Sequence, residues 1–144
     1  MKCKPLAYQS PEYEAMLDLR YRVLRRPLGL EFDEEQLAQE ANDELFGFFD
    51  GDTLIGCFIL TQEENKDHYR IRQVAVEPEW QGRGIGKAMM LFAELWARQK
   101  GAKTLCCHAR ESVALFYDRL GYDIIGDLFY EVRIPHYYME KTLG

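Results

Sequence analysis

The stretch VAVEPEWQGRGIG, residues 74–86, decides the fold of this chain. It begins with the apolar run Val74–Val76, turns at Pro78 and continues into the glycine-rich run Gln81–Gly86. Apolar residues at helical spacing follow directly, so the stretch predicts a strand, a tight turn and a helix. A strand that delivers free backbone N–H groups to a helix N-terminus is typical of a site for a phosphorylated ligand.

Two well-known phosphate-binding motifs do not fit this run. The dinucleotide fingerprint G-x-G-x-x-G matches Gly82 and Gly84 but meets Lys87 at its third glycine. The Walker loop would also end at Lys87, yet Gln81 stands in place of its first glycine. Ala88 stands in place of the hydroxyl residue that would hold magnesium. Both motifs therefore fail on their chemistry as well as on their pattern.

The composition narrows the class of protein. A net charge of −6 argues against a nucleic-acid binder, because neutralising phosphates needs a basic surface. No apolar run approaches the length of a membrane span, and the N-terminus has no apolar signal-peptide region. The cysteines have no C-x-x-C spacing, and we expect reduced core thiols, no metal site and a cytoplasmic protein. They are Cys3, Cys57, Cys106 and Cys107.

Charge is distributed unevenly along the chain. Residues 31–52 carry many acids and no Lys or Arg, whereas residues 81–110 are biased toward basic side chains. The basic part suits an anion and the acidic part suits a cationic partner, although both also fit ordinary solvated faces.

Patterning and turn residues predict the remaining elements. Ser10 and Pro11 begin a helix that ends before Pro27, and the acidic segment that follows is expected to be a loop. The expected strands span residues 4–9, 44–50, 53–61, 68–77, 103–108, 122–125, 128–132 and 135–141, and the expected later helices span residues 85–100 and 111–120. Glu94 and Arg98 are expected to pair on the outer face of the first of these helices. We predict one α/β (α+β) domain over residues 1–144, with a mixed, mostly antiparallel central sheet flanked by helices.

The glycine run does fit the pattern Q-x-x-G-x-G, at Gln81, Gly84 and Gly86. With this motif the sequence resembles the GNAT superfamily of acetyl-CoA-dependent N-acyltransferases, in which R/Q-x-x-G-x-G/A follows the fourth strand and binds the pyrophosphate of coenzyme A. The segment LFYDRLGY, residues 115–122, is similar to the family's F-Y-x-x-x-G-F segment. Residues 20–29 and 134–139 resemble the smaller ElaA-like branch.

The resemblance implies an N-acetyltransferase with acetyl-CoA as cosubstrate. It would transfer the acetyl group to a primary amine of a small molecule or peptide by direct attack on the thioester. The implied coenzyme A contacts are Val74, Ala75, Val76, Gln81, Gly82, Arg83, Gly84, Ile85, Gly86, Lys87 and Arg110. Arg110 departs from the family, which often has Asn at this point, and it fits a phosphate contact, an acceptor contact or a strand cap.

Acetyl transfer to an amine needs a base, an oxyanion site and a proton donor for the thiolate. The resemblance implies that Tyr117 is the general acid, although an aromatic residue at this place also fits core packing. His136 is the candidate base, because histidine titrates near neutrality, although a hydrogen-bonded structural histidine is the alternative. Glu131 and His108 are further candidates. The fourth strand offers a glutamate only at its end, at Glu77.

Two other classes of function remain open from the sequence. One is a non-catalytic acyl-CoA-binding or sensor module on the same fold, and the other is a structural protein that pairs chains through an exposed strand edge. A covalent thiol mechanism has no legible Cys-His-Asp arrangement. We expect an amine acceptor as partner, no nucleic acid, no membrane, and a monomer or homodimer.

Overall fold

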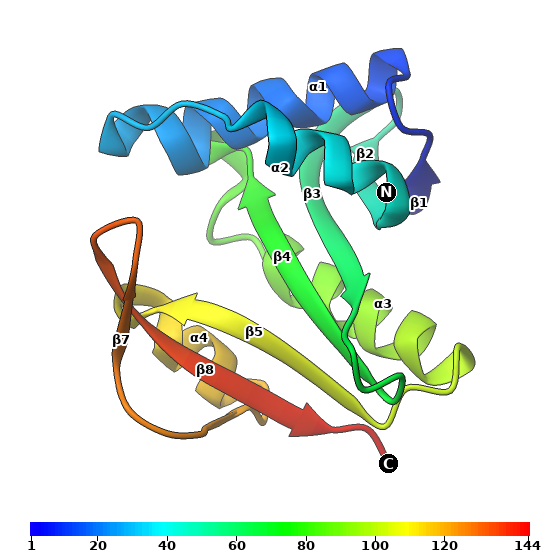
Figure 1. The fold of residues 1–144 in the computed structure, drawn as a ribbon. Helices are drawn as coiled ribbons and strands as arrows, with labels where there is room; N and C mark the ends of the chain where they lie inside the picture. The colour runs from blue at the N-terminus through cyan, green and yellow to red at the C-terminus, as the bar shows by residue number, and fades with distance from the viewer. The chain divides into compact units, whose positions relative to one another are not determined.

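The computed structural model describes residues 1–144 and contains eight strands and four α-helices (Figure 1). The strands are β1 (Lys2–Leu6), β2 (Glu44–Asp50), β3 (Thr53–Gln62), β4 (His68–Val76), β5 (Thr104–Arg110), β6 (Asp123–Ile124), β7 (Phe129–Glu131) and β8 (Ile134–Thr142). The helices are α1 (Pro11–Arg20), α2 (Glu34–Gln39), α3 (Ile85–Gln99) and α4 (Ala114–Arg119).

The strands form one mixed sheet in the order β1-β2-β3-β4-β5-β8-β6, and β7 pairs with β8. β4 and β5 are parallel, whereas β1–β2, β2–β3, β5–β8, β6–β8 and β7–β8 are antiparallel. The predicted α/β class with a mostly antiparallel sheet is therefore confirmed.

The chain divides into two compact units. The first comprises Met1–Thr61 and Gln73–Ala93, and the second comprises Gln62–Arg72 and Glu94–Gly144. β4 and α3 each begin in one unit and end in the other. None of the helices is both long and apolar enough to cross a membrane.

In the first unit, α1 begins as the sequence predicts. The Ser10 hydroxyl accepts a hydrogen bond from the Tyr13 N–H at 3.1 Å, and Pro11 occupies the first turn. α1 buries Tyr13, Met16 and Leu19 in the core of this unit. The chain continues as a π-helix over Tyr21–Arg25, so the regular helix ends before Pro27, as predicted.

The acidic segment is not only a loop, which corrects the prediction. It contains α2, whose N-cap Asp33 accepts a hydrogen bond from the Glu35 N–H at 2.9 Å. Glu34 and Glu35 lie in the first turn, where the helix dipole favours negative charge. The sequence did not reveal this helix, because no apolar stripe accompanies the Asp33 cap.

The predicted hairpin of β2 and β3 is confirmed, with a register shift between Phe48 and Phe49. A Cβ atom at Gly47 would lie 2.8 Å from Leu54, and one at Gly56 would lie 2.9 Å from the Met89 sulfur. These glycines allow the close approach that their place in the strands suggests.

In the second unit, Glu94 does not pair with Arg98 on an outer face, which corrects a second prediction. Glu94 is 3 % exposed and accepts hydrogen bonds from the Tyr122 hydroxyl at 2.8 Å and from Lys141 Nζ at 3.0 Å. Lys141 also donates to the Leu120 carbonyl at 2.9 Å. A buried carboxylate needs such partners, and they come from β8 and from the end of α4, so no local pattern reveals them.

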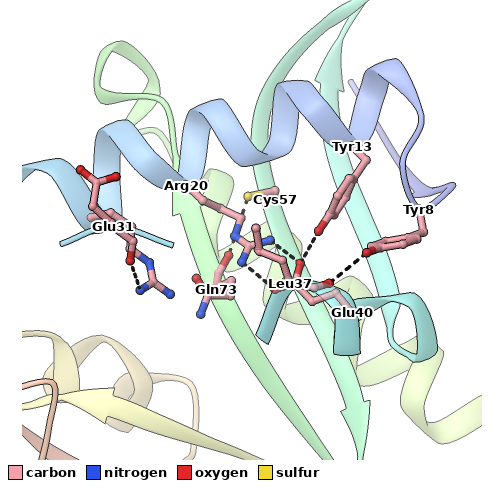
Figure 2. A network of polar contacts seen from close by, with 9 residues as sticks. Tyr8, Tyr13, Arg20, Glu31, Leu37, Glu40, Cys57 and Gln73 are labelled. Atoms are coloured by element: carbon pink, nitrogen blue, oxygen red, sulfur yellow. Dashed lines mark hydrogen bonds and ion pairs between the residues drawn. The ribbon is translucent and has the colours of Figure 1, made fainter. Parts of the chain in front are cut away.

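A buried ion pair joins α1 to the C-cap of α2 in the first unit (Figure 2). Arg20 donates two hydrogen bonds of 2.8 Å to the Glu40 carboxylate, and the Tyr13 hydroxyl donates a third of 2.8 Å. Arg20 and Glu40 are each 1 % exposed. The Arg20 guanidinium also lies over the Phe32 ring at 5.2 Å. This network fixes residues 32–40 against α1.

Replacing Glu40 with Ala is expected to destabilise the protein strongly, because Arg20 would keep its charge in a buried place without a counter-ion. Removing one partner of a buried ion pair costs about 3–5 kcal/mol of unfolding free energy. Urea denaturation measures the change. The control is Glu12→Ala, which removes the exposed Lys4–Glu12 pair and should cost less than about 1 kcal/mol. Equal losses in the two variants would contradict the prediction.

Candidate functional site

The loop between β4 and α3 turns the chain by means of two left-handed glycines. Pro78–Trp80 form a short 3₁₀ turn, and Gly82 and Gly84 then have φ angles of +78° and +83°. A Cβ atom would meet nothing within 4 Å at either position, so glycine is required by the backbone conformation and not by lack of space. The space beside both residues is open.

The start of α3 leaves backbone donors available. The Ala88 N–H donates to the Gly84 carbonyl at 3.0 Å. The N–H groups of Ile85, Gly86 and Lys87 precede this bond and have no acceptor within the helix. The Ile85 side chain is buried, whereas the Arg83 and Lys87 side chains are exposed. Free N–H groups, the positive end of the helix dipole and two basic side chains together suit the binding of an anion.

The loop is fastened to the end of its strand. Gln81 Nε2 donates to the Val76 carbonyl at 3.0 Å, and the Arg83 guanidinium lies 4.9 Å from the centroid of the Trp80 ring. The structure thus brings together two sets of the predicted coenzyme A contacts, namely Val74–Val76 and Gln81–Lys87, both in the first unit.

Glu77 is held by an arginine. Arg22, in the π-helix after α1, donates from Nη1 to Glu77 Oε2 at 3.0 Å, and its second terminal nitrogen contacts the other carboxylate oxygen. Arg22 Nε also donates to Asp18 at 2.8 Å. Glu77, the glutamate at the end of the fourth strand, therefore serves as an anchor for this end of β4.

Sequence reasoning did not single out Gln73. Its φ angle is +53° inside β4, a left-handed conformation that interrupts a strand in the manner of a β-bulge. The Gln73 carbonyl accepts a weak hydrogen bond from the Cys57 thiol at 3.7 Å. The one signal in the sequence is that polar alternation changes to a continuous apolar run at this residue, directly before Val74.

In the second unit, Tyr117 lies on α4 and is 7 % exposed. Its ring packs edge-on against Phe116 and Tyr122, with centroids 5.1 and 5.8 Å apart. Burial, with a smaller contribution from Cys107, raises the pKa of the Tyr117 hydroxyl above its usual range. The phenol therefore keeps its proton at neutral pH, as a proton donor must.

The second unit also brings together Arg110 and His136, which are register partners on β5 and β8. His136 Nδ1 lies 2.7 Å from the Ile134 carbonyl, and its Nε2 lies 3.6 Å from Glu131. His108 lies on the other side of the same carboxylate, at 3.4 Å. The three candidates for a base in this unit thus form one cluster. Burial lowers the pKa of Arg110, although a guanidinium stays protonated at neutral pH.

No group of three His, Cys, Asp or Glu side chains is arranged to hold a metal ion. The four cysteines are free, and Cys57, Cys106 and Cys107 are buried. Burial raises the pKa of the Cys106 thiol to about 11 and that of the other three thiols to about 12. These thiols lack the thiolate character that a covalent mechanism needs.

Comparison with known proteins decides the family. The model of the acetyltransferase (GNAT) family matches residues 10–122. The chain belongs to the GNAT acetyltransferase family. The uncharacterized N-acetyltransferase YitI of Bacillus subtilis is 27% identical over 150 residues, which cover 96% of this chain and 97% of YitI. The uncharacterized protein YyaT of the same organism is 28% identical over 75 residues, which cover 52% of this chain and only 51% of YyaT.

Solved structures share the GNAT fold. A putative N-acetyltransferase from Lactobacillus plantarum superimposes with a TM-score of 0.85 at 24% identity, over 99% of both chains. An aminoglycoside 6'-N-acetyltransferase complexed with coenzyme A has a TM-score of 0.82 at 16% identity, over 99% of this chain and 97% of that one. Escherichia coli ElaA has a TM-score of 0.81 at 18% identity, over 97% of this chain and 98% of the ElaA chain.

The raised thiol pKa values predict slow labelling of the folded protein. An unfolded thiol ionises near pH 8.5, so at pH 8 each folded thiol should react at least about 100-fold more slowly with a thiol reagent than in the urea-unfolded chain. Because ionisation is easier in the unfolded chain, the free energy of unfolding should fall as the pH rises above about 8.5. Labelling with mass detection tests this, and one thiol that reacts equally fast in both states would contradict it.

Proposed function

We propose that this protein is an acetyl-CoA-dependent N-acetyltransferase that acetylates a primary amine of a small molecule or peptide. The observation that carries the proposal is the loop at Gly82 and Gly84, which ends β4 and presents the free N–H groups of α3 in a GNAT chain. The coenzyme A complex of a protein with the same fold supports it. We further propose that residues 1–144 act as one domain, as a monomer or homodimer in the cytoplasm.

The chemistry of coenzyme A fits the strand end and the glycine loop of the first unit. Its pyrophosphate would accept hydrogen bonds from the N–H groups of the 82–87 backbone, while Arg83 and Lys87 supply positive charge. Its amide-bearing arm would pair with the backbone of Val74–Val76, as an added strand pairs with a sheet edge. The same backbone would donate to the oxyanion of the tetrahedral intermediate. Arg110 would contact a phosphate.

Tyr117 and His136 would handle the protons. The amine nitrogen must lose its charge before it attacks the thioester carbon, and His136 belongs to the group that takes this proton. The thiolate of coenzyme A leaves when the C–S bond breaks, and Tyr117 gives it a proton. Exposed acids of residues 31–35 favour a cationic acceptor, namely Glu31, Asp33, Glu34 and Glu35.

Replacing Gly84 with Ala is expected to weaken binding of coenzyme A at least about tenfold, because the left-handed backbone that aims the N–H groups becomes strained. Gly101→Ala is the matched control. Gly101 has a φ angle of +88° with the same open space, but it lies beyond the other end of α3. Both variants should lose similar unfolding free energy, and only Gly84→Ala should lose affinity in calorimetry. Equal affinity in the two variants would contradict the proposed pyrophosphate site.

Tyr117→Phe tests the acid. This variant keeps the packing against Phe116 and Tyr122 but has no proton to donate, so kcat should fall by about 10²-fold or more. The affinity for acetyl-CoA should stay nearly unchanged. Thiol release with a panel of amines measures kcat, and calorimetry measures the affinity. An unchanged kcat would remove Tyr117 from the acid role.

The second candidate function is a non-catalytic acyl-CoA sensor on the same fold. A tyrosine at the position where the resemblance implies the general acid favours the enzyme, because a sensor has no need of a proton donor. A protein that binds acetyl-CoA but releases no thiol with any amine would support the sensor instead.

A further inference from the structure

We propose that Glu131 is the residue that takes the proton from the acceptor ammonium, that His136 shares this proton, and that His108 positions the Glu131 carboxylate. This inference rests on the proposed function, since it names the base of that reaction. It differs from a direct role of the His136 imidazole, because the Glu131 carboxylate is the most exposed part of the cluster.

Exposure separates the three side chains. The Glu131 side chain is 49% exposed, that of His108 is 28% exposed and that of His136 is only 6% exposed. Glu131 Oε1 lies 3.4 Å from His108 Nδ1, and Glu131 Oε2 lies 3.6 Å from His136 Nε2. A substrate amine therefore meets the carboxylate first, and both nitrogens of His136 already face groups of the protein.

The contacts of His136 define where its protons lie. The Ile134 carbonyl only accepts hydrogen bonds, so His136 Nδ1, at 2.7 Å, must carry a hydrogen and donate it. A neutral His136 then presents the lone pair of Nε2 to Glu131, and an ionised carboxylate also has only lone pairs to offer. The contact between His136 Nε2 and Glu131 Oε2 becomes attractive when one proton is added between these two atoms. The pair is thus arranged to receive a proton.

His108 holds the other carboxylate oxygen without competing for that proton. Arg70 Nη1 lies 3.2 Å from His108 Nε2, and a guanidinium can only donate. His108 Nε2 is therefore the acceptor, and His108 Nδ1 carries the hydrogen that points to Glu131 Oε1. A neutral His108 in this tautomer orients the carboxylate and leaves Oε2 for the shared proton.

The surrounding structure fixes the cluster in place. Phe129 stacks on His136 at 5.8 Å and meets His108 edge-on at 5.3 Å. The turn between β7 and β8 consists of Val132 and Arg133, with φ angles of +46° and +64°. Both residues are left-handed, as a two-residue hairpin turn requires, although neither is a glycine. This strained turn holds Glu131 opposite Ile134, two residues before His136.

The cluster lies at the C-terminal end of β5, and the segment that leads to the proposed acid Tyr117 begins at the same end. His136 is the register partner of Arg110, the last residue of β5. The chain runs from Arg110 through a short 3₁₀ turn into α4, which carries Tyr117. The proposed base Glu131 and the proposed acid Tyr117 are thus both connected to the C-terminal end of β5.

Other charged groups around the cluster come from neighbouring strands. Arg70 on β4 and Arg110 on β5 are cationic, and each lies beside a histidine of the cluster: Arg70 Nη1 is 3.2 Å from His108 Nε2, and Arg110 is the register partner of His136. Glu63 lies 3.8 Å from Arg70 and offsets part of its charge. Tyr138 on β8 has its ring 6.1 Å from His108, and burial raises the pKa of its hydroxyl, so it stays neutral.

In each turnover the ammonium loses two protons and the leaving thiolate gains one. The ammonium R–NH₃⁺ gives one proton to Glu131 Oε2 and His136 Nε2, and the resulting amine attacks the thioester carbon. The C–N bond forms and the C–S bond breaks. The nitrogen loses its second proton to solvent, and the thiolate receives one from Tyr117, which is reprotonated by solvent. The proton held by Glu131 and His136 leaves to solvent, so each turnover releases one proton.

The test is the pH dependence of acetyl transfer in Glu131→Gln. In the wild type, kcat/KM should rise with pH while the cluster loses its proton and then reach a plateau. In Glu131→Gln the plateau should be lower by about 10²-fold or more, and the rise should follow only the ionisation of the amine. Glu131→Asp keeps the carboxylate and should restore part of the rate. Glu14→Gln removes an exposed glutamate of α1 and serves as the control, with an unchanged profile.

A second measurement does not depend on activity. Nitrogen chemical shifts of the neutral histidine rings should show a hydrogen on Nδ1 and none on Nε2, for both His108 and His136. A hydrogen on Nε2 of either neutral ring would overturn the assignment, as would a Glu131→Gln variant with the wild-type pH profile. If the wild type transfers no acetyl group to any amine, the proposed function fails, while the ring shifts still test the cluster.

Discussion

The eight residues from Glu77 to Gly84 must turn the chain from a strand into a helix and leave the first N–H groups of that helix free. Two left-handed glycines make the turn possible, and the bond from Gln81 to the Val76 carbonyl closes it. Arg22 holds Glu77 from the side of α1. Because these contacts are made within the protein, the free N–H groups remain available to an anion. The proposed binding of coenzyme A depends on this geometry.

Each unit also contains a buried carboxylate with its cation. Glu40 meets Arg20 and Tyr13 in the first unit, and Glu94 meets Lys141 and Tyr122 in the second. Such pairs add less to stability than their geometry suggests, since both ions lose hydration. Each pair also constrains the packing around it, because the loss of one partner would leave an uncompensated buried charge. The pair of Glu40 with Arg20 thus holds the short helix α2, which has no apolar stripe, against α1.

Local signals predicted most elements, and they failed where a partner lay far along the chain. Ser10 with Pro11 located α1, and Asp50 with its neighbours located the hairpin of β2 and β3. The outer-face pairing of Glu94 was wrong, because its partners lie on β8 and after α4. The helix in the acidic segment was missed, since its packing depends on Glu40 and Arg20. The left-handed Gln73 had almost no signal in the sequence.

By itself, the sequence determined the glycine loop, the order of the strands and of the helices other than α2 and, with the Phe116–Tyr117 segment, the family. These features depend on spacing and on the conformations that glycine alone adopts readily. Only the tertiary structure decided which carboxylates are buried and which titratable side chains lie together. Glu131, His108 and His136 are ordinary residues in the sequence, and they meet because β5, β7 and β8 are paired in one register. Register follows from packing over the whole sheet, which no local pattern contains.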